Sequence, residues 1–296
     1  MIGELAALGT SLAFSFGSVF LTLAGRRVGS IVLNRTRLLF AIVFLGITHW
    51  ITLGIPIPLY AEPHRWLWLG LSGVVGLVLG DVFLFQAFVW IGPRLSMLMM
   101  SLVPIFAAFL AWIFLGEQMG WVQIIGVLIT LGGVVWVVME QNDANKAENP
   151  NYARGILYGL AGAIGQASGL ILAKNGLGGE FSPISANIIR MICAAVVLWI
   201  IALLQGQAKE TVQIVVNNRR GLLFIVIGAV FGPFLGVSFS MLAIQRAQVG
   251  IASTLMALPP VFLLPISYFV FKERYGWGVI VGTAIAIAGV AVLFLI

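Results

Sequence analysis

Ten long apolar stretches follow one another along the chain. They cover residues 3–25, 31–53, 66–90, 94–115, 120–139, 153–174, 184–205, 221–245, 250–271 and 277–295. A membrane-spanning helix needs about 20 predominantly apolar residues. The stretches do not alternate apolar and polar residues as the strands of a lipid-embedded barrel do, so each is predicted to be a helix. The pattern therefore predicts an all-α membrane protein with ten transmembrane helices.

This apolar pattern occurs twice. When the chain is shifted by 156 residues, residues 76–138 align without a gap on residues 232–294. The identical pairs include Gly80/Gly236, Phe83/Phe239, Pro104/Pro260, Phe106/Phe262, Glu117/Glu273, Trp121/Trp277, Gly126/Gly282 and Gly133/Gly289. Internal repetition of an apolar unit predicts two structural repeats. In membranes such repeats are typical of transporters whose site lies between the halves.

A polar segment separates the two copies. We expect a first five-helix repeat over residues 1–139, a linker over residues 140–151 and a second five-helix repeat over residues 152–296. Five crossings are an odd number, so the second copy enters the membrane with the opposite orientation. The sequence therefore predicts inverted repeats, related by an axis in the membrane plane.

Basic residues are unevenly distributed between the two sets of connections. The connections after the first, third, fifth, seventh and ninth stretches hold twelve Lys or Arg residues, and the others hold three, with Arg190 set aside as intramembrane. Cytoplasmic loops carry an excess of Lys and Arg. This distribution predicts that both termini lie outside the cytoplasm.

Composition limits the chemistry that the chain can perform. Charged residues make up 9% of the chain and hydrophobic residues 61%, whereas a soluble domain carries about 25% charge. The net charge of +6 is therefore interpreted as a topology signal, and no nucleic-acid partner is expected. Cys193 is the single cysteine, and His49 and His64 lack neighbours at metal-binding spacing. We expect no metal, no cofactor and no enzymatic activity.

Small residues recur at helical spacing in both halves. Gly126 and Gly133, with their counterparts Gly282 and Gly289, form stripes on the fifth and tenth predicted helices. Such stripes let helix backbones approach closely in lipid. Tight helix packing is the favoured interpretation of these positions.

Several motifs resemble the EamA-type drug/metabolite transporter family, and the resemblance covers the whole chain. They are a proline in the fourth helix of each half (Pro104 and Pro260), a terminal glutamate on that helix (Glu117 and Glu273), an arginine in each second helix (Arg37 and Arg190) and a glycine-rich fifth helix. The resemblance implies ten helices in two repeats, with helices 1, 3, 4, 6, 8 and 9 around a central cavity. It also implies cytoplasmic termini, in conflict with the charge distribution.

Asp81 is the sharpest candidate for function. A carboxylate in the middle of a membrane helix costs about 2.5–3.5 kcal/mol or more, so it should face the protein interior or a wet cavity. One hypothesis is that Asp81 binds substrate or exchanges a proton, and the alternative is that it only joins helices. Gln86 is a second polar candidate on the same helix, about 140° further round.

Other polar residues are candidates because the resemblance places their helices around the cavity. They are Ser15, Ser18, Gln166 and Ser168 on the first and sixth helices, and Met100, Ser101, Thr254 and Met256 beside the prolines of the fourth and ninth. A proline frees a backbone carbonyl and bends a helix. Hydroxyl groups that only bond to their own helix are the alternative for each serine and threonine.

Four further charges are candidates for gating or structural roles. Inversion places Arg37 on the same membrane face as Glu273, and Arg190 on the same face as Glu117. Each glutamate is interpreted as a carboxylate near the start of the next helix, where the helix dipole favours it. A cross-repeat ion pair that acts as a gate is the alternative.

The leading functional hypothesis is a secondary transporter that exports a small metabolite or amphipathic compound by alternating access. A flippase for a lipid-linked substrate is the alternative, because related small proteins of this superfamily do such work. The expected partners are a small-molecule substrate, the lipid bilayer and protons as a coupling ion, with the chain acting as a monomer or homodimer. The expected location is the bacterial inner membrane, with multiple crossings.

Overall fold

The computed structural model describes residues 1–140, 151–259, 261–263 and 276–294, and these residues form helices and short connections without a strand. The first half contains α1 (Ile2–Val28), α2 (Ser30–Leu53), α3 (Pro63–Gly73), η1 (Val74–Gly80), α4 (Asp81–Met100), α5 (Val103–Leu115) and α6 (Trp121–Glu140). The second half contains α7 (Tyr152–Gly176), α8 (Pro183–Leu204), α9 (Ala208–Asn217), α10 (Arg219–Ala229), η2 (Val230–Gly236), α11 (Val237–Arg246), α12 (Val249–Met256) and α14 (Trp277–Phe294). The all-α fold class is confirmed.

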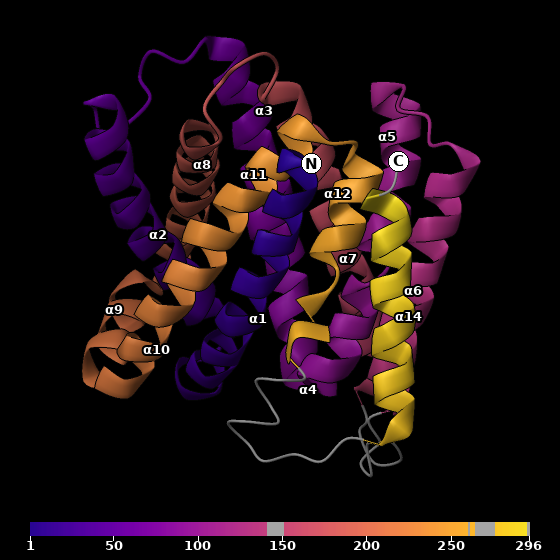
Figure 1. Ribbon diagram of the computed structural model, residues 1–296. Coiled ribbons are helices and arrows are strands. Elements are labelled where there is room, and N and C mark those ends of the chain that lie inside the picture. Colours follow the sequence, from indigo (N-terminus) through magenta and orange to yellow (C-terminus); the bar gives the residue numbers. More distant parts are fainter. Residues whose placement is uncertain (141–150, 260, 264–275, 295–296) are drawn as a thin grey trace.

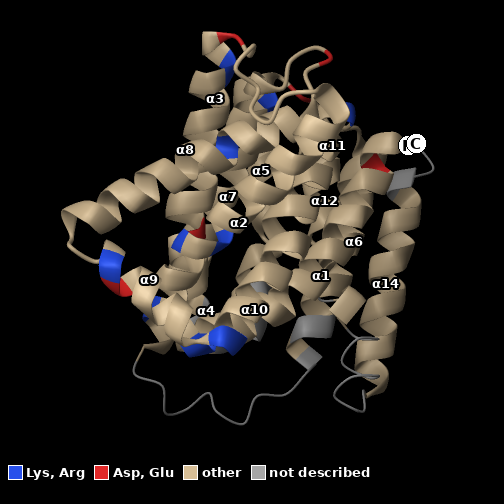
Figure 2. Ribbon diagram, turned by 90° about the vertical axis from the view of Figure 1, so that its left-hand side faces the viewer, with Lys and Arg blue, Asp and Glu red and all other residues tan. Residues whose placement is uncertain are grey.

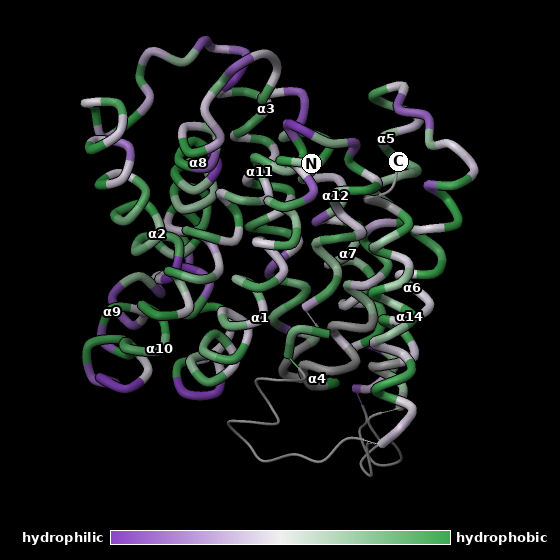
Figure 3. The backbone as a smooth tube through the Cα atoms, viewed as in Figure 1, coloured by the Kyte–Doolittle hydropathy of each residue, from purple (hydrophilic) through white to green (hydrophobic). Residues whose placement is uncertain are grey.

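The helices form one upright bundle whose sides are apolar (Figures 1 and 3). Within the described residues, six helices are long and apolar enough to cross a membrane, and four further apolar helices are shorter. Charged residues gather toward the two ends of the bundle, with one small group midway along it (Figure 2). The chain is thus an integral, multi-pass membrane protein. The count of ten crossings and the inversion of the repeats stay predictions.

Both halves contain the same backbone irregularity. The segments η1 and η2 are seven-residue π-helices, and each begins and ends 156 residues from the other, the offset of the sequence repeat. In each case the first amide after the π-helix donates across five residues, from Asp81 to the carbonyl of Gly76 and from Val237 to that of Gly232. A π-helix adds a residue to the turn and leaves carbonyl groups without regular partners.

A matching side chain satisfies the same carbonyl in each half. The Nδ2 atom of Asn34 lies 3.3 Å from the carbonyl oxygen of Leu77, and the Nδ2 atom of Asn187 lies 3.0 Å from that of Pro233. The two asparagines are aligned by the repeat, whose offset is 153 residues in the second helix of each half, and the two acceptors are aligned at the offset of 156 residues. The duplicated asparagine therefore has a structural explanation, because it fixes the second helix of each half to a π-helical segment.

The first helix of each half packs on the other half. In Figure 1 the indigo α1 runs beside the orange helices, and it packs mainly on α10, η2, α11 and α12. In the same way α7 packs on α3, η1, α4 and α5. The two repeats are therefore interlocked, and neither half buries its first helix by itself.

Glycines make the closest contacts between the halves. A Cβ atom on Gly133 would lie 2.7 Å from the Cα atom of Ala286, and one on Gly289 would meet the backbone of Thr130. Both contacts join α6 to α14. Between α7 and η1, a Cβ on Gly169 would lie 3.0 Å from the Cα atom of Gly76. The prediction that the stripes of the fifth and tenth helices serve packing is confirmed at these positions.

One connection differs from the sequence prediction, and another contains a short helix of its own. The sequence pattern separates the third and fourth apolar stretches at Gly92 and Pro93, but both residues lie within α4, which continues to Met100. The chain turns at Ser101 and Leu102 instead, and Pro104 is the second residue of α5. In the polar connection after α8, a short amphipathic helix, α9, forms, and Thr211 on it accepts a 3.2 Å hydrogen bond from Arg35.

Candidate functional site

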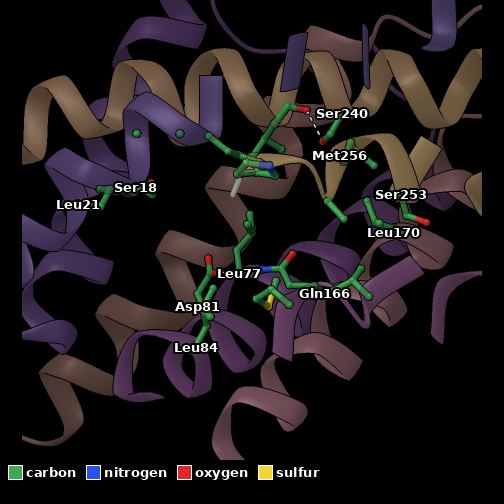
Figure 4. Close-up of a pocket in the computed structure, with 18 of the residues that line it drawn as sticks. Ser18, Leu21, Leu77, Asp81, Leu84, Gln166, Leu170, Ser240, Ser253 and Met256 are labelled. Atoms are coloured by element: carbon green, nitrogen blue, oxygen red, sulfur yellow. Dashed lines mark hydrogen bonds between the residues drawn. The ribbon is translucent and has the colours of Figure 1, made fainter. Parts of the chain in front are cut away.

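A cavity lies at the centre of the bundle, between helices of both halves. It encloses about 1180 Å³ of empty space, its open mouth included. The lining side chains and backbone belong to Phe14, Gly17, Ser18, Leu21, Arg37, Leu77, Asp81, Leu84, Phe85, Met100, Ser101, Val103, Gln166, Leu170, Arg190, Gly232, Val237, Ser240, Ser253, Met256, Ala257 and Pro259. Figure 4 shows part of this wall, with Asp81 and Gln166 on the same side of the cavity.

The cavity draws on equivalent positions of the two repeats. Six pairs aligned by the sequence repeat both contribute to its wall: Arg37/Arg190, Asp81/Val237, Leu84/Ser240, Met100/Met256, Ser101/Ala257 and Val103/Pro259. The wall is thus partly symmetric in position but not in chemistry. In particular, Val237 in the second half is equivalent to Asp81, which is the only carboxylate among the described lining residues.

Asp81 is held by two partners on different helices. One carboxylate oxygen forms an ion pair with the Nη2 atom of Arg37 on α2, and the other accepts a 2.7 Å hydrogen bond from Nε2 of Gln166 on α7. Both Asp81 and Arg37 are about 95% buried, being 4% and 5% exposed. Because each oxygen already has a donor, the carboxylate is neutralised and oriented within the cavity wall.

The partners of Asp81 are in turn anchored to η1. The Nε atom of Arg37 donates to Oδ1 of Asn34 at 3.0 Å, and Asn34 donates to the carbonyl of Leu77. Gln166 also donates to the carbonyl of Gly76 at 3.3 Å. The polar chain thus begins and ends on the π-helix, where the carbonyl groups of Gly76 and Leu77 are the acceptors.

Arg190 occupies the position equivalent to Arg37 but has different partners. Its Nη1 atom lies 3.3 Å from the sulfur of Met241, and a thioether is only a weak acceptor. Its buried Nε atom has no hydrogen-bond partner among the described residues. Asp81 attracts it electrostatically. In its own half, however, the position equivalent to Asp81 is Val237, which offers no carboxylate.

Eight of the predicted site residues line the central cavity. They are Ser18, Arg37, Asp81, Met100, Ser101, Gln166, Arg190 and Met256. Gln86 does not line it, and instead borders a separate pocket with Ser30, Trp90 and Tyr158. The helical rotation of about 140° between Asp81 and Gln86 explains this difference.

Three other predicted positions also lie outside the cavity wall. The hydroxyl of Ser15 donates to the carbonyls of Ser11 at 2.7 Å and Pro259 at 3.3 Å, and that of Thr254 donates within its own helix to Gly250 at 2.8 Å. Ser168 lies two positions after Gln166, about 200° round α7. The carbonyl of Leu255, four residues before Pro259, accepts a 2.5 Å hydrogen bond from the hydroxyl of Ser11, as expected where a proline lacks an amide hydrogen for it.

The assignment of Glu117 needs correction. One oxygen accepts a 2.8 Å hydrogen bond from the amide of Val249, at the start of α12, and the other lies 3.7 Å from Nζ of Lys174. It therefore caps a helix of the opposite half instead of the next helix along the chain, and its cationic partner is Lys174 instead of Arg190. Glu273 lies outside the described residues.

Two hydroxyl groups of the wall, Ser240 and Ser253, are absent from the residues that the sequence predicts. Ser253 lies three residues before Met256, on the same helix face, whereas the predicted Thr254 lies on another. Ser240 is the repeat counterpart of Leu84, and its hydroxyl donates to the carbonyl of Val237 at 2.8 Å (Figure 4). Combining the repeat alignment with helical periodicity would have found both.

Long apolar helices around a central, partly polar cavity define the class of this protein: it is a multi-pass membrane transporter. The sequence profile of the EamA-like transporter family matches residues 1–139 and 153–295. The chain belongs to that family, and the resemblance noted from its motifs is confirmed.

Similarity to individual proteins agrees with this assignment. A probable 4-amino-4-deoxy-L-arabinose-phosphoundecaprenol flippase subunit ArnE of Pseudomonas fluorescens is 34% identical over 89 residues, which cover 30% of this chain and 73% of that protein. A solved crystal structure with 17% sequence identity matches with a TM-score of 0.77 and covers 99% of this chain and 96% of that chain. The structural similarity shows a shared fold.

Proposed function

We propose that the protein is a secondary transporter that exports a small metabolite or amphipathic compound by alternating access between two inverted repeats. The observation that carries this proposal is the cavity wall, to which equivalent positions of both halves contribute. A site on the pseudo-symmetry axis stays in place while the halves rock around it. We place the protein in a bacterial inner membrane.

Contacts at one end of the bundle support a closed state of such a cycle. At the end where α1 begins, Glu117 of the first half contacts Lys174 and Val249 of the second. Beside them, Nε2 of Gln248 lies 3.4 Å from the carbonyl oxygen of Gln118. On α1 the cavity wall begins only at Phe14. These contacts join the two halves at this end, and they must separate if substrate leaves through it.

Locking this end is expected to abolish transport. In a Cys193→Ser background, Gln118→Cys and Gln248→Cys would be joined by a short cleavable bismaleimide after reconstitution into proteoliposomes. We expect counterflow of labelled metabolites, screened as anionic, zwitterionic and cationic sets, to stop on cross-linking and to resume after cleavage. The two single-cysteine variants treated with the same reagent serve as controls. Transport by the cross-linked protein at the uncross-linked rate would refute alternating access at this end.

Flipping of a lipid-linked substrate is the second candidate, favoured by the function that the name of the ArnE relative states. A wall that is largely apolar, with residues such as Phe14, Leu21 and Leu170, is also compatible with an acyl chain. The same proteoliposomes distinguish the two functions. Movement of a labelled lipid-linked sugar between leaflets without counterflow of soluble compounds would favour the flippase.

Protons are proposed as the coupling ion, with Asp81 as the carrier. We expect Asp81→Asn to abolish the dependence of transport on a pH gradient, because the amide cannot release a proton, while the protein still inserts. The measurement compares initial rates with and without an imposed gradient. If the variant loses thermal stability but its residual transport still follows the gradient, Asp81 has only a structural role.

A further inference from the structure

Within the described part of the chain, the cavity wall contains two basic groups and one acidic group. Among its described residues the ionisable side chains are Arg37, Asp81 and Arg190. Asp81 forms its ion pair with Arg37, and that pair is neutral as a unit. The wall therefore retains one positive charge, which resides on Arg190.

Burial makes this remaining charge costly. Arg190 is 2% exposed, and a charged side chain at membrane depth is expensive unless it is paired. Its Nε atom is buried without a partner among the described residues, and Nη1 reaches only the sulfur of Met241. The Nη2 atom lies 3.5 Å from the Cβ position of Gly76 on η1, so a larger residue there would crowd the guanidinium. The arginine is accommodated, but no described oxygen accepts a hydrogen bond from it.

The asymmetry of the repeat explains why the pairing is incomplete. Arg37 and Arg190 are equivalent, but Asp81 is replaced by Val237 in the second half. A carboxylate at Val237 would have completed a second neutral pair. A ligand can supply the oxygen acceptor that Arg190 lacks within the protein.

We propose that Arg190 binds an anionic group of the transported compound, a carboxylate or a phosphate attached to an apolar body. This inference rests on the proposed transport function and names its substrate class. The guanidinium presents a planar set of donors that matches both anions and can bind them through two parallel hydrogen bonds. The apolar body would lie against Phe14, Leu84 and Leu170, which line the rest of the wall.

Ligand binding tests this assignment without a transport assay. The protein would be placed in nanodiscs of phosphatidylcholine, which has no net charge, and titrated calorimetrically with hexyl phosphate, hexanoate, hexylammonium and hexanol. We expect the two anions to bind more tightly than hexanol, and hexylammonium to bind more weakly. Arg190→Gln should weaken anion binding by about tenfold or more, because a charged hydrogen-bond donor is lost.

Matched variants separate this role from a structural one. Arg246→Gln removes the same charge at the exposed end of α11, where Arg246 pairs with Glu180, and should leave anion affinity unchanged. Arg190→Lys keeps the charge and should retain part of the affinity. Asp81→Asn frees Arg37 and should strengthen anion binding severalfold, whereas a purely structural pair predicts weaker binding.

Three outcomes would overturn the assignment: tighter binding of hexylammonium than of the anions, unchanged anion affinity in folded Arg190→Gln, or weaker anion binding in Asp81→Asn. If Arg190→Gln does not fold, the anion affinities of Arg190→Lys and Asp81→Asn test the assignment instead. Titration with inorganic phosphate and with dihexanoyl phosphatidic acid compares a free anion with a lipid headgroup. Binding of either supports the anion site, and the tighter ligand shows whether the natural anion is free or part of a lipid. Anion binding without any transport would instead refute only the proposed function.

Discussion

Replacing Arg37 with methionine is expected to destabilise the protein by about 3–5 kcal/mol, because it leaves the buried carboxylate of Asp81 without its cation. Gln166 donates only a neutral amide hydrogen to Asp81, and Arg190 attracts Asp81 without a hydrogen bond to it, so neither replaces the ion pair. The loss would be measured as a shift in the denaturation midpoint in mixed detergent micelles. It should exceed the loss in Arg246→Gln, which removes an exposed charge.

The double variant Arg37→Met/Asp81→Leu provides the control for this prediction. Replacing both members of a buried ion pair by apolar residues of similar size is often close to neutral. We therefore expect the double variant to regain most of the stability lost in the single one. A single variant that loses less than about 1 kcal/mol, well below the usual cost of breaking a buried pair, would show that Asp81 is not held as a charge by Arg37.

Gly133→Ala is expected to destabilise the contact between α6 and α14 by about 1–3 kcal/mol, the usual range for overpacking. The added methyl carbon would lie 2.7 Å from both the Cα atom of Ala286 and the carbonyl oxygen of Gly282. Backbone cannot move aside as a flexible side chain can, so the two helices must separate. Thermal unfolding followed by helix content would report the loss.

The neighbouring glycine is a matched control. A Cβ atom on Gly132 would have nothing within 4 Å, so Gly132→Ala should be neutral or slightly stabilising, because alanine favours helix more than glycine does. Equal stability of the two variants would mean that α6 and α14 are not in backbone contact.

The repeat and its main site residues can be predicted because they depend on local pattern. Apolar length identifies the helices, and the alignment of Arg37 with Arg190 marks two intramembrane charges from the sequence alone. Asp81 and Gln166 are recognisable as candidates because polar groups are costly at membrane depth. The structure places these two side chains 2.7 Å apart on the cavity wall.

Other features cannot be predicted in this way because they depend on contacts between distant segments. The π-helices cannot be recognised from the hydrophobic pattern. Each adds one residue to a glycine-rich turn, and that residue is apolar like its neighbours. The partners of Glu117 are set by the packing of α5 against α7 and α12, and no sequence pattern brings Lys174 to it. Ser253 lines the cavity and Thr254 does not, because α12 turns the face of Ser253 toward the cavity. The sequence pattern does not show which face of this helix meets the cavity.

The paired π-helices also bear on the ancestry of the chain. An extra residue inserted into a helix turns everything after it by about 100°, so such an insertion is not easily acquired later without misplacing the residues that follow. Its occurrence at matching positions in both halves indicates that it was already present in the single ancestral unit, before duplication and fusion. The carboxylate at Asp81, absent from the second copy, is then a feature in which the two copies have since diverged.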